Sequence, residues 1–134
     1  MAQYPSQRSQ AELISSAPDL RFPTPVRHLL VKADGRMHCL RIREIDWCQA
    51  EGNYVQIHLG PRSFQIRSTL AEICKRLTAF HFSRISRTTV VNIDRILEIQ
   101  PTGTGAYDVL LHGGRSWRLT RGYRDNFMER FCLL

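Results

Sequence analysis

The chain has 134 residues, 43% of them hydrophobic, which is enough for one domain that buries a core without disulfide bonds or metal. No apolar run approaches the roughly eighteen residues that a membrane-spanning helix needs, and the N-terminus lacks an apolar signal core. We therefore expect a cytoplasmic protein. Its formal net charge of +7 is compatible with nucleic acid, an acidic protein or an anionic membrane surface as partner.

Residues 1–24 differ in composition from the remainder of the chain. They are rich in Ser, Gln and Ala, and they are interrupted by Pro5, Pro18 and Pro23. Only residues 11–14 hint at a helical turn. This composition predicts a flexible lead or linker, followed by one domain over residues 25–134. Charges of the two signs balance within the lead, so the whole positive excess belongs to the domain.

Apolar alternation and turn residues predict short β-strands through most of this domain. Asp34-Gly35 separates apolar runs at residues 29–31 and 39–42, a pattern typical of a tight hairpin. Residues 54–59 alternate as in a half-buried strand, and residues 64–66 return after a turn at 60–63. A further strand is expected at residues 95–99. A last hairpin is expected at 107–111 and 116–119, around Gly113-Gly114.

Two short helices complete the expected elements. Thr69 and Glu72 form a capping-box pattern ahead of a helix over about residues 70–77, and Thr120 is expected to cap a terminal helix over about 121–131. With about nine or ten short strands, the chain is predicted to be mostly β. A helix-turn-helix is excluded because no pair of helices has the length and spacing that it needs.

Within residues 82–92, FSRISRTTVVN, two β-favouring runs are joined through residues 84–89, which carry two arginines and three hydroxyl side chains. Arg84 and Arg87 cannot be buried unpaired without a large desolvation cost, so at least one should face outward. The stretch resembles the signature of the LytTR family of bacterial DNA-binding domains, where a phenylalanine, an arginine and a second polar or basic position lead into a hydrophobic-Val-Asn end. One departure is Ser86, where the family often has histidine.

The resemblance continues on both sides of this stretch. Glu51-Gly52-Asn53-Tyr54-Val55 lies upstream, Phe64-x-x-Arg67-x-x-Leu70 lies between, and Leu119-Thr120-Arg121-x-Tyr123 lies downstream, so the order fits from about residue 29 to residue 131. The resemblance implies an elongated fold of stacked, mostly antiparallel sheets that reads DNA through loops. In the family this module usually follows a receiver or a membrane sensor domain. The chain is therefore interpreted either as a stand-alone member, which Met1 favours, or as part of a longer protein.

Three polar residues match places where the family contacts DNA bases: Asn53, Arg87 and Arg121. Arginine can donate two hydrogen bonds to guanine O6 and N7, and asparagine can pair with adenine N6 and N7. Each residue also has a structural alternative. Asn53 could hold a left-handed turn, Arg87 could pair with Asp94 or Glu98, and Arg121 could pair with Asp125. Asn92 is expected to be structural, as a cap on residues 93–95.

Other arginines are candidates for phosphate contacts, which position a protein on DNA without specifying sequence. They are Arg62, Arg84, Arg67, Arg118 and Arg124, with Arg115 as a further candidate; any one of them can also be a solvated charge. Trp47, Trp117 and Tyr54 could stack on unpaired bases, but aromatic residues in strands are more often part of the core.

No motif in the sequence asks for an enzyme, a cofactor or a metal. The four cysteines and five histidines have no metal-ligand spacing, and neither a nucleophile elbow nor a phosphate-binding loop is present. We expect Cys39, Cys48, Cys74 and Cys132 to be buried or partly buried thiols.

The leading interpretation is a sequence-specific double-stranded DNA-binding transcriptional regulator, not an enzyme, with neither a membrane partner nor a small-molecule substrate. The resemblance implies two copies on direct-repeat half-sites, with self-association on DNA. The alternative is a protein-interaction or ligand-sensing β module whose basic surface meets an acidic partner. A single-stranded RNA binder is a third option.

Overall fold

The computed structural model describes residues 9–13 by their backbone, and residues 27–77 and 81–134 with their side chains. The described residues form eleven strands, two α-helices and two short 3-10 helices. The elements are β1 (Ser9–Leu13), β2 (His28–Ala33), β3 (Arg36–Arg41), η1 (Ile42–Glu44), β4 (Trp47–Glu51), β5 (Tyr54–Leu59), β6 (Arg62–Arg67), α1 (Leu70–Leu77), β7 (Phe82–Arg84), β8 (Thr89–Asn92), η2 (Ile93–Arg95), β9 (Ile96–Pro101), β10 (Tyr107–Leu111), β11 (Ser116–Leu119) and α2 (Arg121–Met128).

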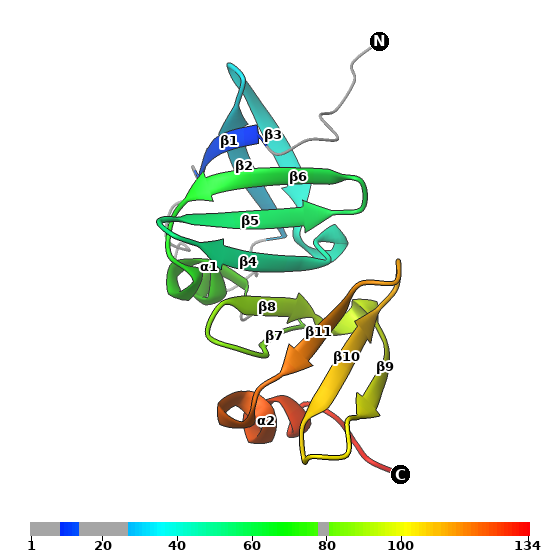
Figure 1. Cartoon of the computed structure of the whole chain (residues 1–134). Helices are drawn as coiled ribbons and strands as arrows, with labels where there is room; N and C mark the ends of the chain where they lie inside the picture. The colour runs from blue at the N-terminus through cyan, green and yellow to red at the C-terminus, as the bar shows by residue number, and fades with distance from the viewer. Residues whose placement is uncertain (1–8, 14–26, 78–80) are drawn as a thin grey trace, which may run out of the picture.

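The strands form two sheets stacked along the length of the molecule (Figure 1). The larger sheet has eight strands in the order β3-β2-β1-β6-β5-β4-β8-β7, and the smaller has the order β11-β10-β9. Every described pairing is antiparallel except that of β1 with β6. The predicted mostly β fold of stacked antiparallel sheets is therefore confirmed.

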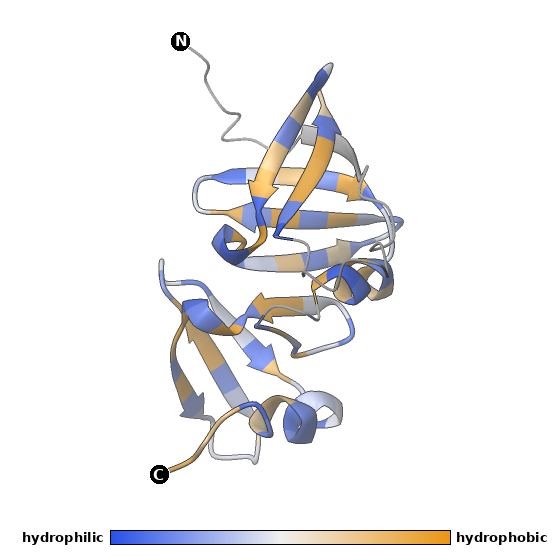
Figure 2. Ribbon diagram, turned by 180° about the vertical axis from the view of Figure 1, so that it is seen from behind, coloured by the Kyte–Doolittle hydropathy of each residue, from blue (hydrophilic) through white to orange (hydrophobic). Residues whose placement is uncertain are grey.

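The local signals in the sequence place most elements correctly. Asp34 and Gly35 both have positive φ, 53° and 73°, so the two-residue turn between β2 and β3 has the conformation that Asp-Gly favours. Helix α1 has the predicted bounds, and the backbone N–H of Glu72 donates to Thr69 Oγ1 over 3.1 Å. Along β5, Val55, Ile57 and Leu59 are buried, and polar and apolar residues alternate along several strands in Figure 2.

Strand β1 was not predicted. It lies within the segment expected to be a flexible lead, and residues 11–13 are extended, so a helical turn at residues 11–14 is wrong for those three. The strand pairs antiparallel with β2 and parallel with β6. It gains main-chain hydrogen bonds from two strands that are distant in sequence, which its own side-chain pattern does not reveal. Residues 1–8 and 14–24 of the predicted lead lie outside the described residues, and a domain boundary near residue 24 stays a prediction.

Two hydrophobic clusters meet at the strands β4 and β8. One cluster packs β2 to β6 around α1, and the other packs the three-stranded sheet around α2. Successive side chains of a strand point to opposite faces, so Cys48 and Val90 enter the first cluster while Trp47 and Val91 enter the second. All four residues of β8 are buried. The residues between β7 and β8 therefore leave the strands at the place where both cores converge.

Candidate nucleic-acid interface

The segment 85–88, which we call the β7–β8 loop, is held by hydrogen bonds at each residue. The N–H of Ile85 donates to Thr89 O over 3.0 Å, and the N–H of Thr88 donates to Ser86 Oγ over 3.2 Å. The Thr88 carbonyl in turn accepts from Ala50 N–H in β4 over 2.8 Å. These bonds fix the backbone from which the exposed Arg87 side chain projects.

Arg84 fixes the same loop from beneath. Its Nε donates to Ser86 O over 3.2 Å and its Nη2 donates to Arg87 O over 2.6 Å, while its guanidinium carbon lies 5.6 Å from the centre of the Tyr123 ring. The sequence suggests Arg84 as a phosphate contact, but the structure gives it a positioning role. No sequence pattern signals this role, because it depends on carbonyl groups that only the folded loop presents.

The Arg87 side chain is the part of the loop that is not tied down. No hydrogen bond or ion pair joins its guanidinium to the described residues. The two acids considered as structural partners are engaged elsewhere: Asp94 lies 3.3 Å from His81 Nδ1, and Glu98 accepts from Gln100. The arrangement leaves Arg87 able to donate to a partner outside the chain.

Asn53 lies in the two-residue turn between β4 and β5. Gly52 carries the positive φ of this turn, 62°, and Asn53 does not have a positive φ, so the left-handed alternative for Asn53 is wrong. The side chain is exposed and has no partner among the described residues. Arg67, which is also exposed, lies near this turn because its strand partner is Tyr54, the residue that follows Asn53 and begins β5.

The corner between β11 and α2 is joined to the β7–β8 loop. Thr120 donates to Ile85 O from its backbone N–H over 2.9 Å and from its hydroxyl over 3.3 Å. Thr120 therefore does not cap α2 with its side chain, contrary to the prediction, because its hydroxyl is used in this tertiary contact. Helix α2 also ends at Met128, three residues before the predicted end.

Arg121 begins α2 immediately after this anchored threonine. It is exposed, and its Nη2 donates to Thr104 O over 3.3 Å. Arg124 donates from Nη1 to Gly105 O over 2.9 Å and lies 3.8 Å from Asp125. The local partner of Asp125 is therefore Arg124, and no ion pair joins Arg121 to Asp125 among the described residues.

These three segments lie along one edge of the molecule. The β4–β5 turn, the β7–β8 loop and the β11–α2 corner follow one another down the left side of Figure 1. The loop is hydrogen-bonded to Ala50, near the end of β4 that leads into the turn, and to Thr120 at the corner. We call this set of segments the loop edge. It presents Asn53, Arg87 and Arg121, so the structure brings the three predicted base-contacting residues to a common side.

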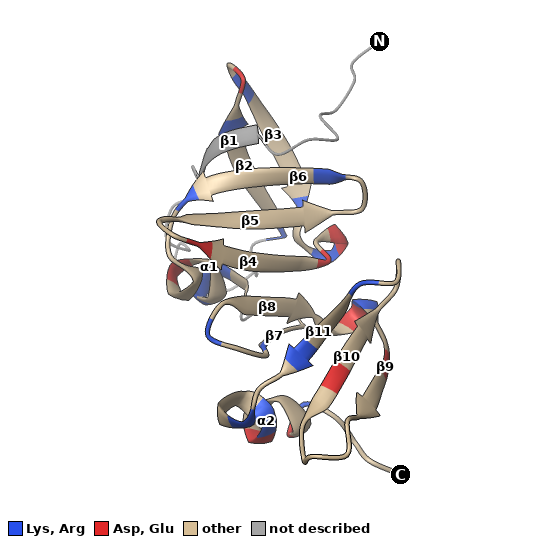
Figure 3. Ribbon diagram, in the orientation of Figure 1, with Lys and Arg blue, Asp and Glu red and all other residues tan. Residues whose placement is uncertain are grey.

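The other predicted phosphate contacts are not all on the loop edge. Arg62 pairs with Leu59 at the opposite end of β5 from Asn53. Arg118 is bound to Asp108 across β10 and β11, with Nε 2.7 Å from the carboxylate. Figure 3 shows Lys and Arg positions along both edges of the ribbon, with Asp and Glu positions interspersed in the three-stranded sheet. Arg67 is the candidate that lies beside Asn53 on the loop edge.

The tryptophans belong to the interior, as preferred from the sequence. Trp47 is 9% exposed, stacks on His58 with ring centres 3.6 Å apart, and meets Trp117 edge-on at 4.8 Å. The Arg115 guanidinium covers both, 4.5 Å from Trp117 and 5.2 Å from Trp47. Trp47 is thus buried and Trp117 half-buried, each with Arg115 over its ring.

Asn92 has the structural role that was expected. It is 1% exposed; its Oδ1 accepts from Asp94 N–H over 2.9 Å, and its Nδ2 donates to Ile45 O over 2.8 Å and to Arg43 O over 3.0 Å. The side chain thereby caps η2 and joins it to the end of η1.

The four cysteines are free thiols, two of them on the surface. Cys48 is buried and Cys74 half-buried, as expected, but Cys39 and Cys132 are exposed. Cys39 is exposed because it points away from the core, to the face of β3 opposite that of the buried Leu40. Burial raises the pKa of Cys48, and burial raises the pKa of Cys74 against an opposing effect of the Arg84 charge. Among residues 27–77 and 81–134, no three metal-binding side chains gather into a site.

The helices of the described part of the chain are too short and too polar to cross a membrane. The family model for the LytTr DNA-binding domain matches residues 35–131. The chain belongs to this LytTr family. The match spans β3 to the residues just beyond α2, and it contains all three segments of the loop edge.

Curated LytTr relatives are similar over part of their length. The chain is 32% identical over 87 residues to the sensory transduction protein LytT of Oceanobacillus iheyensis, which covers 64% of this chain and 35% of that protein. It is 26% identical over 106 residues to the transcriptional regulatory protein LytR of Staphylococcus aureus (strain N315), covering 79% and 43%. The chain thus spans between a third and a half of these relatives.

A solved LytTr DNA-binding domain from Bacillus cereus has the same fold. It superposes with a TM-score of 0.70 and covers 78% of this chain and 95% of that domain, at 15% sequence identity. At this identity the likeness establishes the fold.

Proposed function

We propose that this LytTr chain is the double-stranded DNA-binding module of a transcriptional regulator, and that it reads bases through Asn53, Arg87 and Arg121. The observation that carries the proposal is the loop edge: three exposed polar side chains project from neighbouring segments, and the middle one, the β7–β8 loop, is hydrogen-bonded to β4 and to the β11–α2 corner. Membership of a family of DNA-binding domains, and relatives named as regulators, support this function over catalysis.

The chemistry of the three side chains suits the major groove. Arg87 and Arg121 can each donate two parallel hydrogen bonds to guanine, and Asn53 can pair with adenine. Arg121 would exchange its bond to Thr104 O for a base, which costs little because that bond is 3.3 Å long and exposed. Arg67 supplies a phosphate contact beside Asn53, fixing position without reading sequence.

The protein would occupy direct-repeat half-sites, with two copies associating on the DNA. The family resemblance implies this arrangement, and access to DNA implies a cytoplasmic location.

The decisive experiment selects binding sites from a random duplex pool, then titrates the winning site and a scrambled duplex at two salt concentrations. We expect a repeated motif bound much more tightly than the scrambled duplex. Arg121→Ala should relax preference at one base pair. Arg67→Ala should weaken both duplexes alike and reduce the salt slope by about one. Arg36→Ala is the control, because Arg36 is exposed at the β2–β3 turn, away from the loop edge.

A second candidate function, binding of an acidic protein partner, is favoured by the edge of the molecule opposite the loop edge. Arg62, Arg95 and Arg115 line a pocket of about 680 Å³ between the two sheets, where Asp46 accepts from Gly60 N–H over 2.8 Å and lies 3.4 Å from Arg95. Such a surface could meet an acidic protein segment. Uniform, strongly salt-dependent DNA binding with no enriched motif would favour this alternative.

A further inference from the structure

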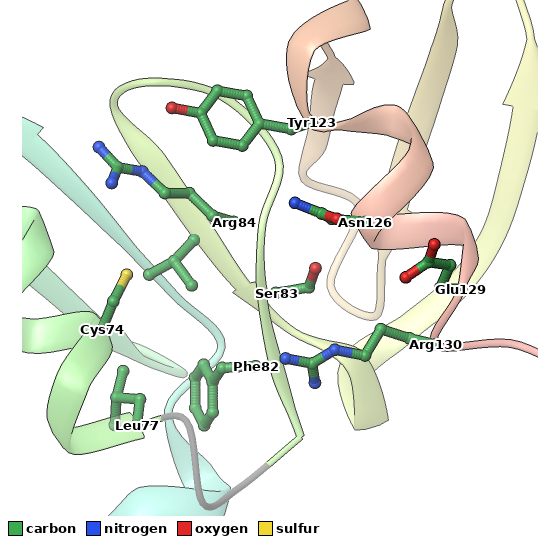
Figure 4. Close-up of a pocket in the computed structure, with 10 residues that line it drawn as sticks. Cys74, Leu77, Phe82, Ser83, Arg84, Tyr123, Asn126, Glu129 and Arg130 are labelled. Atoms are coloured by element: carbon green, nitrogen blue, oxygen red, sulfur yellow. The ribbon is translucent and has the colours of Figure 1, made fainter.

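A second pocket lies directly beneath the β7–β8 loop. It has a volume of about 440 Å³ and is lined by residues of α1, β7, β8, α2 and the turn that follows α2 (Figure 4). Its lining residues are Cys74, Leu77, Phe82, Ser83, Arg84, Val90, Tyr123, Asn126, Glu129 and Arg130. Arg84 is the important member, because the same guanidinium that lines the pocket donates to Ser86 O and Arg87 O.

One side of this pocket is apolar. Leu77, Phe82 and Val90 are buried members of the larger core cluster, and Cys74 packs against it. Burial raises the pKa of the Cys74 thiol, and the opposing charge of Arg84 does not reverse this, so the thiol is protonated at neutral pH. This wall therefore offers a neutral surface to a ring or hydrocarbon chain.

The charged residues that line the pocket give it a positive excess. Arg84 and Arg130 are the two cations among the lining residues, and Glu129 is the one anion. Arg130 is exposed, and no hydrogen bond or ion pair joins its side chain to the described residues. In Figure 4 its guanidinium extends beside Phe82, while the Glu129 carboxylate stays close to the α2 ribbon. A charged group beside an apolar wall suits a ligand with both properties.

We propose that this pocket binds a small organic anion with an apolar ring or chain, held by Arg130 and Arg84, and that binding weakens recognition of DNA. The second half rests on the proposed function. A carboxylate forms a stronger, charge-assisted bond with a guanidinium than a neutral carbonyl does. The anion therefore competes with Ser86 O and Arg87 O for Arg84, and the loop that displays Arg87 loses two of its restraints. Linkage requires bound DNA to lower the affinity for the anion by the same factor as the bound anion lowers the affinity for DNA.

Binding is tested by NMR titration of the full chain with 2-naphthoate, and with the neutral 2-naphthalenemethanol as matched probe. We expect saturable amide shifts from 2-naphthoate at residues 74–77, 82–90 and 123–130, and about tenfold weaker binding to Arg130→Gln. Arg36→Gln, a loss of the same charge at the distant β2–β3 turn, should bind as the unchanged protein does. Equal binding of the neutral alcohol, an unaffected Arg130→Gln variant, or the lack of saturable shifts would overturn the site.

Coupling is tested by measuring the affinity of the selected duplex with and without saturating 2-naphthoate. We expect a loss of affinity that Arg130→Gln largely removes at the same probe concentration. An unchanged DNA affinity with the pocket occupied would overturn the coupling. The two proposals fail separately: a chain that binds 2-naphthoate but no DNA refutes the proposed function, whereas a chain that binds its duplex but not 2-naphthoate refutes the pocket.

Discussion

Arg84 Nη2 donates a hydrogen bond to the backbone oxygen of Arg87, 2.6 Å away, so one arginine shapes the loop that displays another. The two residues are three apart in sequence and share a charge, yet their environments differ. Arg84 is half-buried, committed to two carbonyl groups and packed over Tyr123, whereas Arg87 is exposed and unpaired within the described structure. Substitutions at these positions should therefore have different consequences.

Arg87→Ala should lower base discrimination and leave stability almost unchanged. The lost contact to a guanine is worth about 1 to 3 kcal/mol of discrimination. Because the side chain is exposed, the free energy of unfolding should change by no more than about 0.5 kcal/mol. Competition between the selected duplex and single-base variants measures the first effect, and urea unfolding measures the second. Equal losses on cognate and scrambled duplexes would show that Arg87 contacts phosphate instead.

Arg84→Gln should weaken DNA binding by loosening the loop. The glutamine amide is shorter than the guanidinium and cannot reach both Ser86 O and Arg87 O with a two-pronged donor. We expect faster hydrogen exchange in a peptide covering residues 84–89, and no change in a peptide covering β5. Arg84→Lys should rescue the charge but not the exchange protection. If lysine restored both, a simple electrostatic role would replace the positioning role.

Asn92→Ala should destabilise the protein by about 2 to 4 kcal/mol, because it leaves one N–H and two carbonyl groups without their side-chain partner. Asn53→Ala is the matched control: the same chemical change at an exposed turn should cost less than about 0.5 kcal/mol. Thermal and urea unfolding of both variants measure the difference. A small effect at residue 92 would mean that water replaces the amide at the junction of η1 and η2.

Thiol labelling should proceed in the order of exposure. At pH 8, iodoacetamide should modify Cys39 and Cys132 rapidly, Cys74 slowly, and Cys48 only after unfolding, since the thiolate is the reactive form and burial raises the pKa of both inner thiols. Mass spectrometry of peptides after timed quenching reads out each site. Rapid labelling of Cys48 in the folded protein would contradict the burial of β4.

The buried Cys48 thiol makes the free energy of unfolding depend on pH in the alkaline range. Burial raises the pKa of Cys48 above its ordinary value of 9.0, so the folded chain keeps a proton that the unfolded chain releases. Its contribution to stability is complete below pH 9 and declines as the pH rises above that value. Cys48→Ala should flatten this part of the pH profile in urea unfolding. An unchanged profile would assign the decline to other groups.

Local signals in the sequence predicted most of the fold. Asp34-Gly35, the alternation along β5 and the threonine before α1 each act over a few residues, so the elements they specify agree with the structure. The elements missed depend on distant partners. β1 is a strand because β2 and β6 both lie beside it, and the Thr120 hydroxyl donates to Ile85 O instead of capping α2.

The candidate site was predicted as a set of residues but not as a surface. Asn53, Arg87 and Arg121 were chosen because they match family positions, and the hydrogen bonds of the β7–β8 loop to β4 and to Thr120 explain why their segments lie along one edge. Arg62 and Arg67 are the same residue type and were both predicted as phosphate contacts, yet they lie at opposite ends of β6, so of these two only Arg67 lies at the loop edge. The pocket beneath the loop, which Arg84 lines, is formed by residues of α1, β7 and α2. These elements are separate in sequence, so no single stretch could have predicted the pocket or the positioning role of Arg84.

The position of β1 in the larger sheet affects how this domain can be cut. The family match begins at residue 35, whereas β1 supplies the strand between β2 and β6 from residues 9–13. A version trimmed to residues 25–134 would leave two long strands with unpaired main-chain groups on facing edges. Exposed strand edges pair readily with the edges of other molecules, so trimmed versions are expected to associate through these edges into dimers or larger aggregates.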